Sequence, residues 1–420
     1  MTGISHIRGV PRADAARWPD VARVPRGRFR AAVAERLMRH ALRRLPVRVV
    51  RPGGAGTGDP GLPVLRLHRP DAFHRRLGAD GLIGFGEAYQ AGDWDADDLP
   101  GLLTAFAREV GTLVPRPLQR LRRLYVHRQP DDADGTVRNA RHNIARHYDL
   151  STEMFALFLD PSLTYSAGLF DAADDGLPDE ERLMRAQRRK IDRLLDLAGV
   201  GGGTRVLEIG TGWGELALRA GARGARVDSV TLSAGQREVA ARRIAGAGLA
   251  DRVTVALRDY REVRGTYDAV LSVEMIEAVG YRHWPVYFAA LDRLLGPGGR
   301  AGLQAITMPH DRMLATRDTH TWIQKYVFPG GLIPSVRAVE EQAARTGLAV
   351  ADRFAFGADY AETLRIWRDR FAAHAHDLGG LGFDETFRRT WELYLGYSEA
   401  GFRSRYLDVR QFLLTRKGTR

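Results

Sequence analysis

Apolar and polar residues alternate along the middle of the chain in a way that predicts repeated strand–helix units. Val206, Leu207 and Ile209 form a short apolar run typical of a buried strand, and good helix formers follow at 215–219. Residues 230–236 look like the end of a second strand, with polar residues followed by a helix. Further strand patterns lie at 252–258 and 268–274. Because strands and helices alternate from 188 to 307, we predict an α/β fold with a doubly wound sheet.

The rest of the chain predicts a second, smaller domain. Residues 1–26 lack periodicity and are expected to be a loose extension. Residues 27–128 predict a small α+β domain, and an acidic, breaker-rich linker covers 129–137. The catalytic domain is expected at 138–420, where residues at about 308–400 read mostly helical and predict a cap over the substrate. Within the small domain the patterns predict helices at 29–45 and 81–91 and short strands at 47–50 and 64–67.

Three glycines at alternate positions follow the first strand of the α/β region. Gly210, Gly212 and Gly214 allow positive φ and let backbone amides approach a ligand closely. A dinucleotide site needs GxGxxG so that a pyrophosphate sits on a helix N-terminus, and here the third glycine comes one residue early. S-adenosylmethionine carries ammonium and sulfonium charges instead, which suit an acid such as Glu208. The pattern therefore favours an S-adenosylmethionine site over a dinucleotide site or a glycine-rich turn without a ligand.

Composition narrows the class of protein. The chain has no cysteine, which excludes disulfides and thiolate chemistry, and His142, His147 and His320 are too dispersed for a metal site, so we expect no metal. No apolar run reaches about 18 residues, and no secretory signal follows Met1. We therefore expect a cytoplasmic protein.

Positive charge is concentrated in two arginine clusters. The net charge is +12, and only three of the 63 basic residues are lysines. Residues 26–51 hold nine arginines and one acid, and residues 116–128 hold a second cluster. A solvated helix face and a phospholipid-binding surface both explain these clusters. No aromatic–basic motif indicates nucleic acid.

Motifs over residues 80–415 resemble the cyclopropane fatty acid synthase family in order and spacing. The N-terminal stretch 87–94 is similar to the lipid-engaging domain of longer bacterial members. The other matching segments are 147–151, 163–168, 205–214, 230–236, 259–261, 272–280, 328–335, 356–360 and 401–403.

The resemblance implies a class I, Rossmann-like methyltransferase that uses S-adenosylmethionine to methylate the cis double bond of a phospholipid acyl chain. It implies that Tyr165 and Ser166 bind the methionine end of the donor, and that Glu208, Gly210 and Gly212 bind it from the glycine loop. It further implies that Thr231, Leu232 and Gln236 contact the ribose and adenine, and that Asp259 and Tyr260 contact the adenine edge.

Methyl transfer to an alkene leaves a carbocation, and a base must then remove a proton. In the family that base is thought to be a bound bicarbonate. The resemblance implies that His147, Glu277, Ile306 and Tyr360 match the bicarbonate cage, whereas Ala167, Gln304 and Ala278 replace a cysteine and two histidines.

Glu274 stands where the family usually has glycine. A carboxylate gained beside a depleted cage suggests that Glu274 replaces bicarbonate as the base, with Glu277, Tyr360 and His147 as the other catalytic residues. The alternative is that Glu274 only binds the cofactor.

The same departure favours the branch of the family associated with tuberculostearic (10-methyl) lipids. There the product is a 10-methylene chain that a separate reductase saturates. Cyclopropane formation remains the alternative, followed by a small-molecule methyltransferase whose N-terminal domain serves only dimerisation, and by a non-enzymatic binding module. As partners we expect unsaturated phospholipid at the anionic inner face of the membrane, a second copy of the chain, and no nucleic acid.

Overall fold

A computed structural model describes residues 12–54, 56–109 and 151–418 of the chain. The chain divides into two compact units. The first comprises Met1–Arg128, His320–Tyr326 and Phe371–Ser404, and the second comprises Gln129–Thr319, Val327–Arg370 and Arg405–Arg420. The predicted linker at 129–137, the second arginine cluster at 116–128 and His147 lie outside the described residues.

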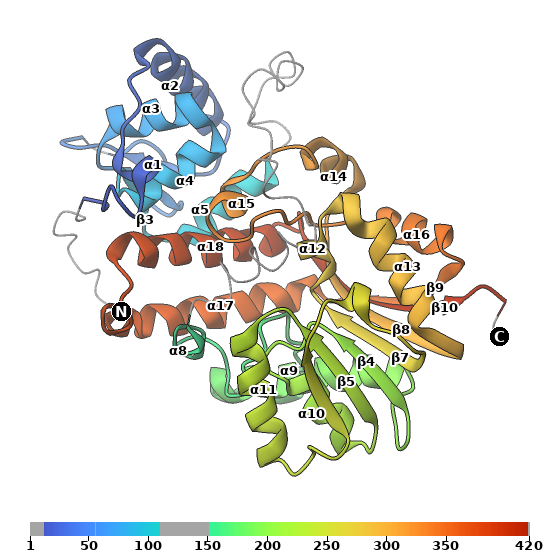
Figure 1. The fold of residues 1–420 in the computed structure, drawn as a ribbon. Coiled ribbons are helices and arrows are strands. Elements are labelled where there is room, and N and C mark those ends of the chain that lie inside the picture. The colour runs from blue at the N-terminus through green and yellow to red at the C-terminus, as the bar shows by residue number, and fades with distance from the viewer. Residues whose placement is uncertain (1–11, 55, 110–150, 419–420) are drawn as a thin grey trace. The chain divides into compact units, whose positions relative to one another are not determined.

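The second unit is built on a seven-stranded sheet, counted over the described residues, with the order β6-β5-β4-β7-β8-β10-β9 (Figure 1). Its first five strands in this order are parallel, and β10 runs antiparallel to both β8 and β9. Strand order reverses between β4 and β7, the position at which open α/β sheets bind ligands. The predicted doubly wound α/β fold is confirmed. The strands are β4 (Arg205–Ile209), β5 (Arg226–Thr231), β6 (Val253–Leu257), β7 (Tyr267–Val273), β8 (Leu295–Thr307), β9 (Leu348–Ala355) and β10 (Asp408–Arg416).

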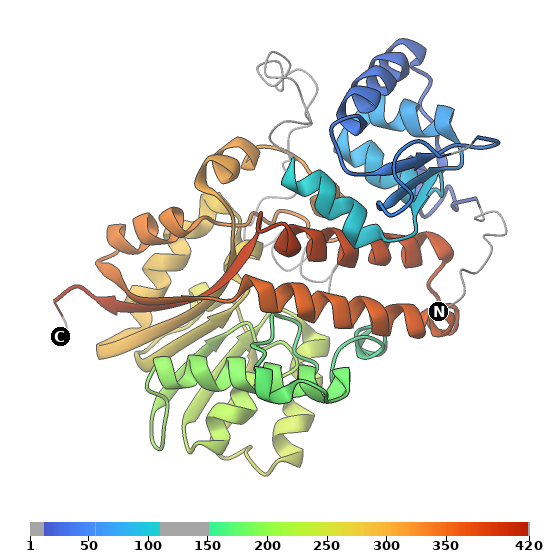
Figure 2. The same cartoon turned by 180° about the vertical axis from the view of Figure 1, so that it is seen from behind.

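Helices cover both faces of this sheet (Figures 1 and 2). Apolar residues of α9, α10 and α11 form one buried cluster with the strands, and residues of α12, α13 and α16 form another. Burial on both faces explains why the central strands read as apolar runs rather than alternating patterns. The helices are α8 (Thr152–Ala156), α9 (Asp179–Leu197), α10 (Glu215–Ala222), α11 (Ala234–Gly246), α12 (Ile276–Val279), α13 (Trp284–Leu294), α14 (His310–Thr316), α16 (Val336–Arg345) and α17 (Gly357–Ala373).

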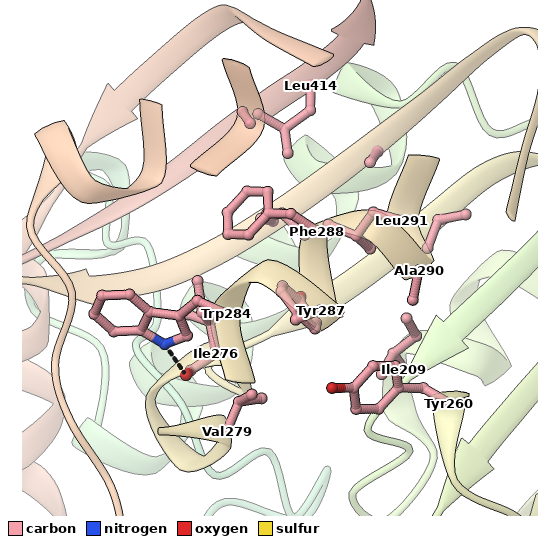
Figure 3. Close-up of a cluster of buried hydrophobic side chains, with 14 of the residues drawn as sticks. Ile209, Tyr260, Ile276, Val279, Trp284, Tyr287, Phe288, Ala290, Leu291 and Leu414 are labelled. Atoms are coloured by element: carbon pink, nitrogen blue, oxygen red, sulfur yellow. Dashed lines mark hydrogen bonds between the residues drawn. The ribbon is translucent and has the colours of Figure 1, made fainter. Parts of the chain in front are cut away.

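The short helix α12 is held in place by the core beneath it. Ile276 and Val279 are buried against α13, and the indole nitrogen of Trp284 donates a 3.1 Å hydrogen bond to the carbonyl of Ile276 (Figure 3). Because Glu277 lies between these anchors, its position is fixed by apolar packing.

The first unit combines a small sheet, order β1-β2-β3, with helices. The predicted helices at 29–45 and 81–91 correspond to α2 and α4, and the predicted strands to β1 and β2. The elements are α1 (Pro19–Ala22), α2 (Arg28–Leu42), β1 (Arg48–Val50), β2 (Val64–Leu67), α3 (Pro70–Asp80), α4 (Leu82–Gln90), β3 (Trp94–Ala96), α5 (Leu99–Arg108), α15 (Trp322–Tyr326) and α18 (Glu385–Arg403).

Two segments differ from the expected domain plan. The described part of the expected loose extension contains α1, where Val21 is buried and its carbonyl accepts a hydrogen bond from Arg76. The expected helical cap contains β9, an edge strand of the main sheet, and α18, which belongs to the first unit. There Arg389 of α18 donates to the carbonyls of Tyr89 and Trp94. An amphipathic pattern shows that one helix face is buried but not which element buries it.

Within the described ranges, no helix is long and apolar enough to cross a membrane.

Candidate active site

A cavity in the second unit opens at the carboxyl ends of β4, β5, β6 and β7. This is the edge of the sheet at which the strand order reverses. The residues expected to bind the cofactor all line it: Tyr165, Ser166, Glu208, Gly210, Gly212, Thr231, Leu232, Gln236, Asp259 and Tyr260. Glu274 lines the same cavity. The structure thus brings together segments separated by more than a hundred residues.

The glycine loop is shaped by backbone conformations that other residues rarely adopt. Gly212 has φ of 52°, and a Cβ added there would meet nothing within 4 Å. Gly214 has φ of 92°, and its Cβ would lie 2.9 Å from Cβ of Ala240. Gly214 therefore lets α10 approach α11 closely, while Gly212 keeps the loop open to a ligand.

Glu208 is buried at the end of β4. Its Oε2 accepts a hydrogen bond from the Ser229 hydroxyl, which in turn pairs with Thr211 at 2.6 Å. Burial raises the pKa of Glu208 to about 8, opposed only by the bond from Ser229. The carboxyl group is therefore largely neutral at pH 7, and it gains its charge most readily when a cation lies beside it.

Three of the residues expected at ribose and adenine are held by side-chain hydrogen bonds. The Thr231 hydroxyl donates to Oε1 of Gln236 at 3.1 Å. Both carboxylate oxygens of Asp259 accept bonds from the Arg261 guanidinium, at 2.8 and 2.6 Å. An adenine ring would therefore share the Asp259 carboxylate with Arg261.

Glu274 follows β7 directly, and its carboxylate accepts three hydrogen bonds. Oε1 accepts from the backbone amide of Ala167 at 3.0 Å and from Nε2 of Gln304 at 2.8 Å. Oε2 accepts from the hydroxyl of Tyr360 at 2.6 Å. Burial raises the pKa of Glu274, and the nearby Lys190 ammonium and these bonds oppose that rise. The carboxylate is thus fixed in orientation and partly compensated in charge.

The backbone at Glu274 is strained. Its φ of 48° lies in the left-handed region that favours glycine. This explains why a glycine suits this position in the family that the chain resembles. Strain of this kind costs about 1–3 kcal/mol and persists where the surroundings impose it, often at functional sites.

Glu277 lies three residues further on, in α12. One carboxylate oxygen accepts a bond from the backbone amide of Ile306, whereas Oε2 is buried without a hydrogen-bond partner among the described residues. Burial, and then the charge of Glu274, raise the pKa of Glu277 to about 8. The pair therefore carries one negative charge more readily than two. His147, expected beside Glu277, lies outside the described residues.

Lys190 is a site residue that the sequence reasoning missed. It is buried in α9, lines the cavity, and donates a 2.6 Å hydrogen bond to the Ser166 hydroxyl. Burial lowers the pKa of Lys190 to about 8, opposed by the charges of Glu274, Asp160 and Glu215. A lysine on the apolar stripe of a helix, in a chain whose other basic residues are nearly all arginine, was the available signal.

Gln304 is held from behind by Gln411, which was also missed. Nε2 of Gln411 donates to Oε1 of Gln304 at 3.1 Å and to the Lys190 carbonyl at 2.9 Å. Because the Gln304 oxygen is occupied as an acceptor, its amide nitrogen is directed at Glu274. Two residues on neighbouring antiparallel strands thus position the carboxylate.

An aromatic wall extends from Tyr360. Its ring packs edge-on against Trp367 with centroids 6.2 Å apart, and Trp367 lies 5.3 Å from Tyr165 in the cavity lining. Phe158 contacts both Trp367 and Tyr165. Aromatic faces stabilise cations in such a setting.

These features fit S-adenosylmethionine. The open glycine loop, the buried acid Glu208 and the aromatic wall match a ligand with an adenosine part and cationic centres. When bound, this cofactor supplies an electrophilic methyl group. Among the described residues, no group of three or more His, Cys, Asp or Glu side chains is placed to hold a metal ion.

Comparisons with known proteins show which family the chain belongs to. Residues 136–412 match the family model described as mycolic acid cyclopropane synthetase. The chain is 56% identical over 412 residues to tuberculostearic acid methyltransferase UfaA1 of Mycobacterium tuberculosis, covering 96% of each chain. It is 32% identical over 360 residues to cyclopropane-fatty-acyl-phospholipid synthase of Escherichia coli, covering 84% of this chain and 87% of the relative.

A solved structure shows the same fold. Mycolic acid cyclopropane synthase CmaA1, complexed with SAH and CTAB, aligns with a TM-score of 0.59 and 29% identity, covering 68% of this chain and 98% of CmaA1. The predicted family, the predicted fold class and the predicted use of S-adenosylmethionine are therefore confirmed. The chain belongs to the mycolic acid cyclopropane synthetase family and is an S-adenosylmethionine-dependent methyltransferase.

Proposed function

We propose that this enzyme methylates the cis double bond of an unsaturated acyl chain in a phospholipid and forms a methylene branch of the 10-methylene type. Similarity to a tuberculostearic acid methyltransferase along 96% of both chains supports the lipid substrate. The observation that carries the proposed proton removal is the Glu274 carboxylate, which lines the donor cavity and is oriented by Ala167, Gln304 and Tyr360.

In the proposed reaction the alkene electron pair forms a bond to the methyl carbon, and the pair of the broken sulfur–methyl bond stays on sulfur. The positive charge is left on the adjacent chain carbon. A hydride shift moves the charge to the carbon that carries the new methyl group. Glu274 then accepts a proton from that methyl group, and its C–H pair becomes the methylene double bond. The ring of Tyr165, which lines the cavity, would face the cation meanwhile, and Trp367 packs behind that ring.

Glu274 takes the place of bicarbonate in this proposal. Ala167 and Gln304 stand where the resembling family has a cysteine and a histidine of the bicarbonate cage. Here both residues donate to Glu274 instead, through the Ala167 backbone amide and the Gln304 side chain. Of the two replacements, Gln304 supplies a side-chain donor to the Glu274 carboxylate, whereas position 167 supplies a backbone donor.

Formation of a cyclopropane ring is the second candidate. It is favoured by the 32% identity to a cyclopropane-fatty-acyl-phospholipid synthase, and by Glu277 and Tyr360, which match the family cage. It begins with the same methyl transfer and also loses a proton from the new methyl group. No hydride shift precedes that loss, so the C–H electron pair closes a bond to the cationic chain carbon instead of forming a double bond.

Incubation with dioleoyl phosphatidylglycerol vesicles and ¹³C-methyl-labelled S-adenosylmethionine, followed by NMR of the extracted lipid, tests the proposal. We expect labelled vinylidene signals. High-field ring signals would support the cyclopropane instead, and label only in a soluble acceptor would exclude a lipid substrate.

The partners follow from the same proposal. The substrate lies in a membrane, so the enzyme would act at an anionic membrane surface, on the inner face of the cell membrane. A separate reductase would saturate the methylene product, and the first unit would also serve self-association. Co-purification and light scattering of the full-length protein test these partners.

A further inference from the structure

The helix α2 presents an apolar stripe to solvent. Phe29 is 83% exposed and Val33 is 43% exposed, although both are hydrophobic. With Arg36, Leu37 and His40 they recur at spacings of three and four residues, which places them on one helix face. Val33, Arg36, Leu37 and His40 line a surface hollow of about 260 Å³. We call this set of five residues the α2 face.

The opposite side of α2 explains why this face points outward. Ala34 and Ala41 are buried, and a Cβ added to Gly78 of α3 would lie 2.5 Å from the Arg30 carbonyl. The backbones of α2 and α3 are therefore in close contact, so α2 cannot rotate to bury Phe29 without losing that packing. The apolar stripe is a fixed feature of the first unit.

The surroundings of the α2 face are strongly basic. The exposed side chains of Arg26, Arg28, Arg30, Arg39, Arg43 and Arg44 lie on or next to the helix. Glu35 is the only acid between residues 26 and 51, and it is paired with Arg39 at 2.6 Å. The excess positive charge near the helix is therefore not balanced by its own sequence neighbours.

We propose that the α2 face is the surface by which this enzyme docks on an anionic phospholipid membrane. Phe29 and Val33 would enter the boundary between headgroups and acyl chains, and the arginines around them would bind lipid phosphates. Exposed aromatic and aliphatic residues ringed by arginine suit an interface that is apolar inside and negatively charged at its surface. This inference rests on the proposed lipid substrate, because a membrane-embedded acyl chain requires the enzyme to reach a bilayer.

A nucleic acid would use the arginines but leave Phe29 and Val33 in water. A second copy of the chain would place two strongly basic helices against each other. Neither occupant matches both features of the surface.

Vesicle flotation with the full-length protein tests the proposal. The variant Phe29→Asp with Arg36→Glu is compared with Val286→Asp with Arg345→Glu, an equal charge change at exposed positions of the second unit. Vesicles contain either phosphatidylglycerol with phosphatidylcholine, or phosphatidylcholine alone. We expect binding of the wild type to anionic vesicles that weakens with salt, a loss of tenfold or more in the α2 variant, and near wild-type binding in the control.

Equal binding by both variants, or equal binding of the wild type to neutral and anionic vesicles, would overturn the proposal. Tighter binding to duplex DNA than to anionic vesicles would do the same. Methylation of oleoyl phospholipid in detergent micelles is measured in parallel, and we expect the α2 variant to retain it while losing methylation on vesicles. If the wild type methylates no lipid but still binds vesicles through α2, the proposed function fails and the docking surface stands. Unfolding temperature and S-adenosylhomocysteine binding verify that both variants are folded.

Discussion

The hydroxyl of Tyr360 donates a 2.6 Å hydrogen bond to Oε2 of Glu274 across 86 residues of sequence. This contact joins α17 to the carboxyl end of β7, and so connects the aromatic wall with the carboxylate of the donor cavity. It makes the ionisation of Glu274 depend on a residue outside its own loop.

Replacing Tyr360 by Phe tests this dependence. The hydrogen bond lowers the pKa of Glu274, so its loss raises that pKa, and a base that must be ionised then becomes active only at higher pH. We expect methylation at pH 7 to fall by roughly ten- to a hundredfold, with the acidic limb of the rate profile moved to higher pH. Tyr267→Phe is the matched control, because it removes a hydroxyl bonded to Asp228 outside the cavity lining. An unchanged profile in Tyr360→Phe would contradict the assigned contact.

Lys190 should act on the same profile through its charge. Its ammonium lowers the pKa of Glu274, so Lys190→Met should raise that pKa and shift the acidic limb upward by about one pH unit or more. The groups that also face this pair are Glu277 and Tyr360 around Glu274, and Asp160 and Glu215 around Lys190. Lys417→Met, at an exposed position, is the control. If Lys190→Met lost activity while the acidic limb of its pH–rate profile stayed in place, Lys190 would contribute to folding and not to the pKa of Glu274.

Cofactor affinity should depend on pH through Glu208. Its pKa of about 8 means that a cationic ligand must displace a proton at pH 7, so affinity should rise roughly five- to tenfold from pH 7 to pH 9. Calorimetry in buffers of different ionisation enthalpy measures both the affinity and the released proton. In Glu208→Gln the pH dependence should disappear, whereas Asp228→Asn, on β5 outside the cavity lining, should retain it. Proton uptake on binding would contradict this account.

Substitution of Gly214 in the glycine loop should lower the free energy of unfolding. An alanine there combines φ of 92° with a Cβ 2.9 Å from Ala240, so we expect destabilisation of about 2–4 kcal/mol in urea unfolding. Gly246→Ala is the control, since its Cβ meets nothing within 4 Å at the end of α11, and we expect it to be neutral or stabilising by up to ~1 kcal/mol. A stable Gly214→Ala protein would show that α10 and α11 can separate.

Much of the fold and of the donor cavity was predictable because both depend on local patterns. The apolar runs of β4 to β7 and the glycines after β4 specify parallel strands whose ends meet at one edge, so the residues that follow each strand had to gather there. The segment that forms α18 was expected to be part of the substrate cap, whereas it packs on α4 and α5 of the first unit. Its apolar stripe predicts that one helix face is buried but does not predict which elements bury it.

The catalytic centre was predictable only in part. Glu274 was recognised from its departure from the family, but its positive φ and its bonds to Gln304 and Tyr360 arise from non-local packing. Lys190 and Gln411 were missed because each lies in a regular element whose pattern reads as core. The hydrogen-bond partners of a polar residue on an apolar stripe lie on other elements, so they are known only from the three-dimensional structure.

The central claim is that Glu274 removes the proton, and Glu274→Gln in bicarbonate-depleted and bicarbonate-supplemented buffer tests it most directly. Wild-type methylation of oleoyl phospholipid should be the same in both buffers. The variant should bind S-adenosylhomocysteine normally and lose about 10²–10⁴-fold in rate, as expected for a general base. Undiminished methylation by the variant without bicarbonate, or a wild type that requires bicarbonate, would contradict the claim.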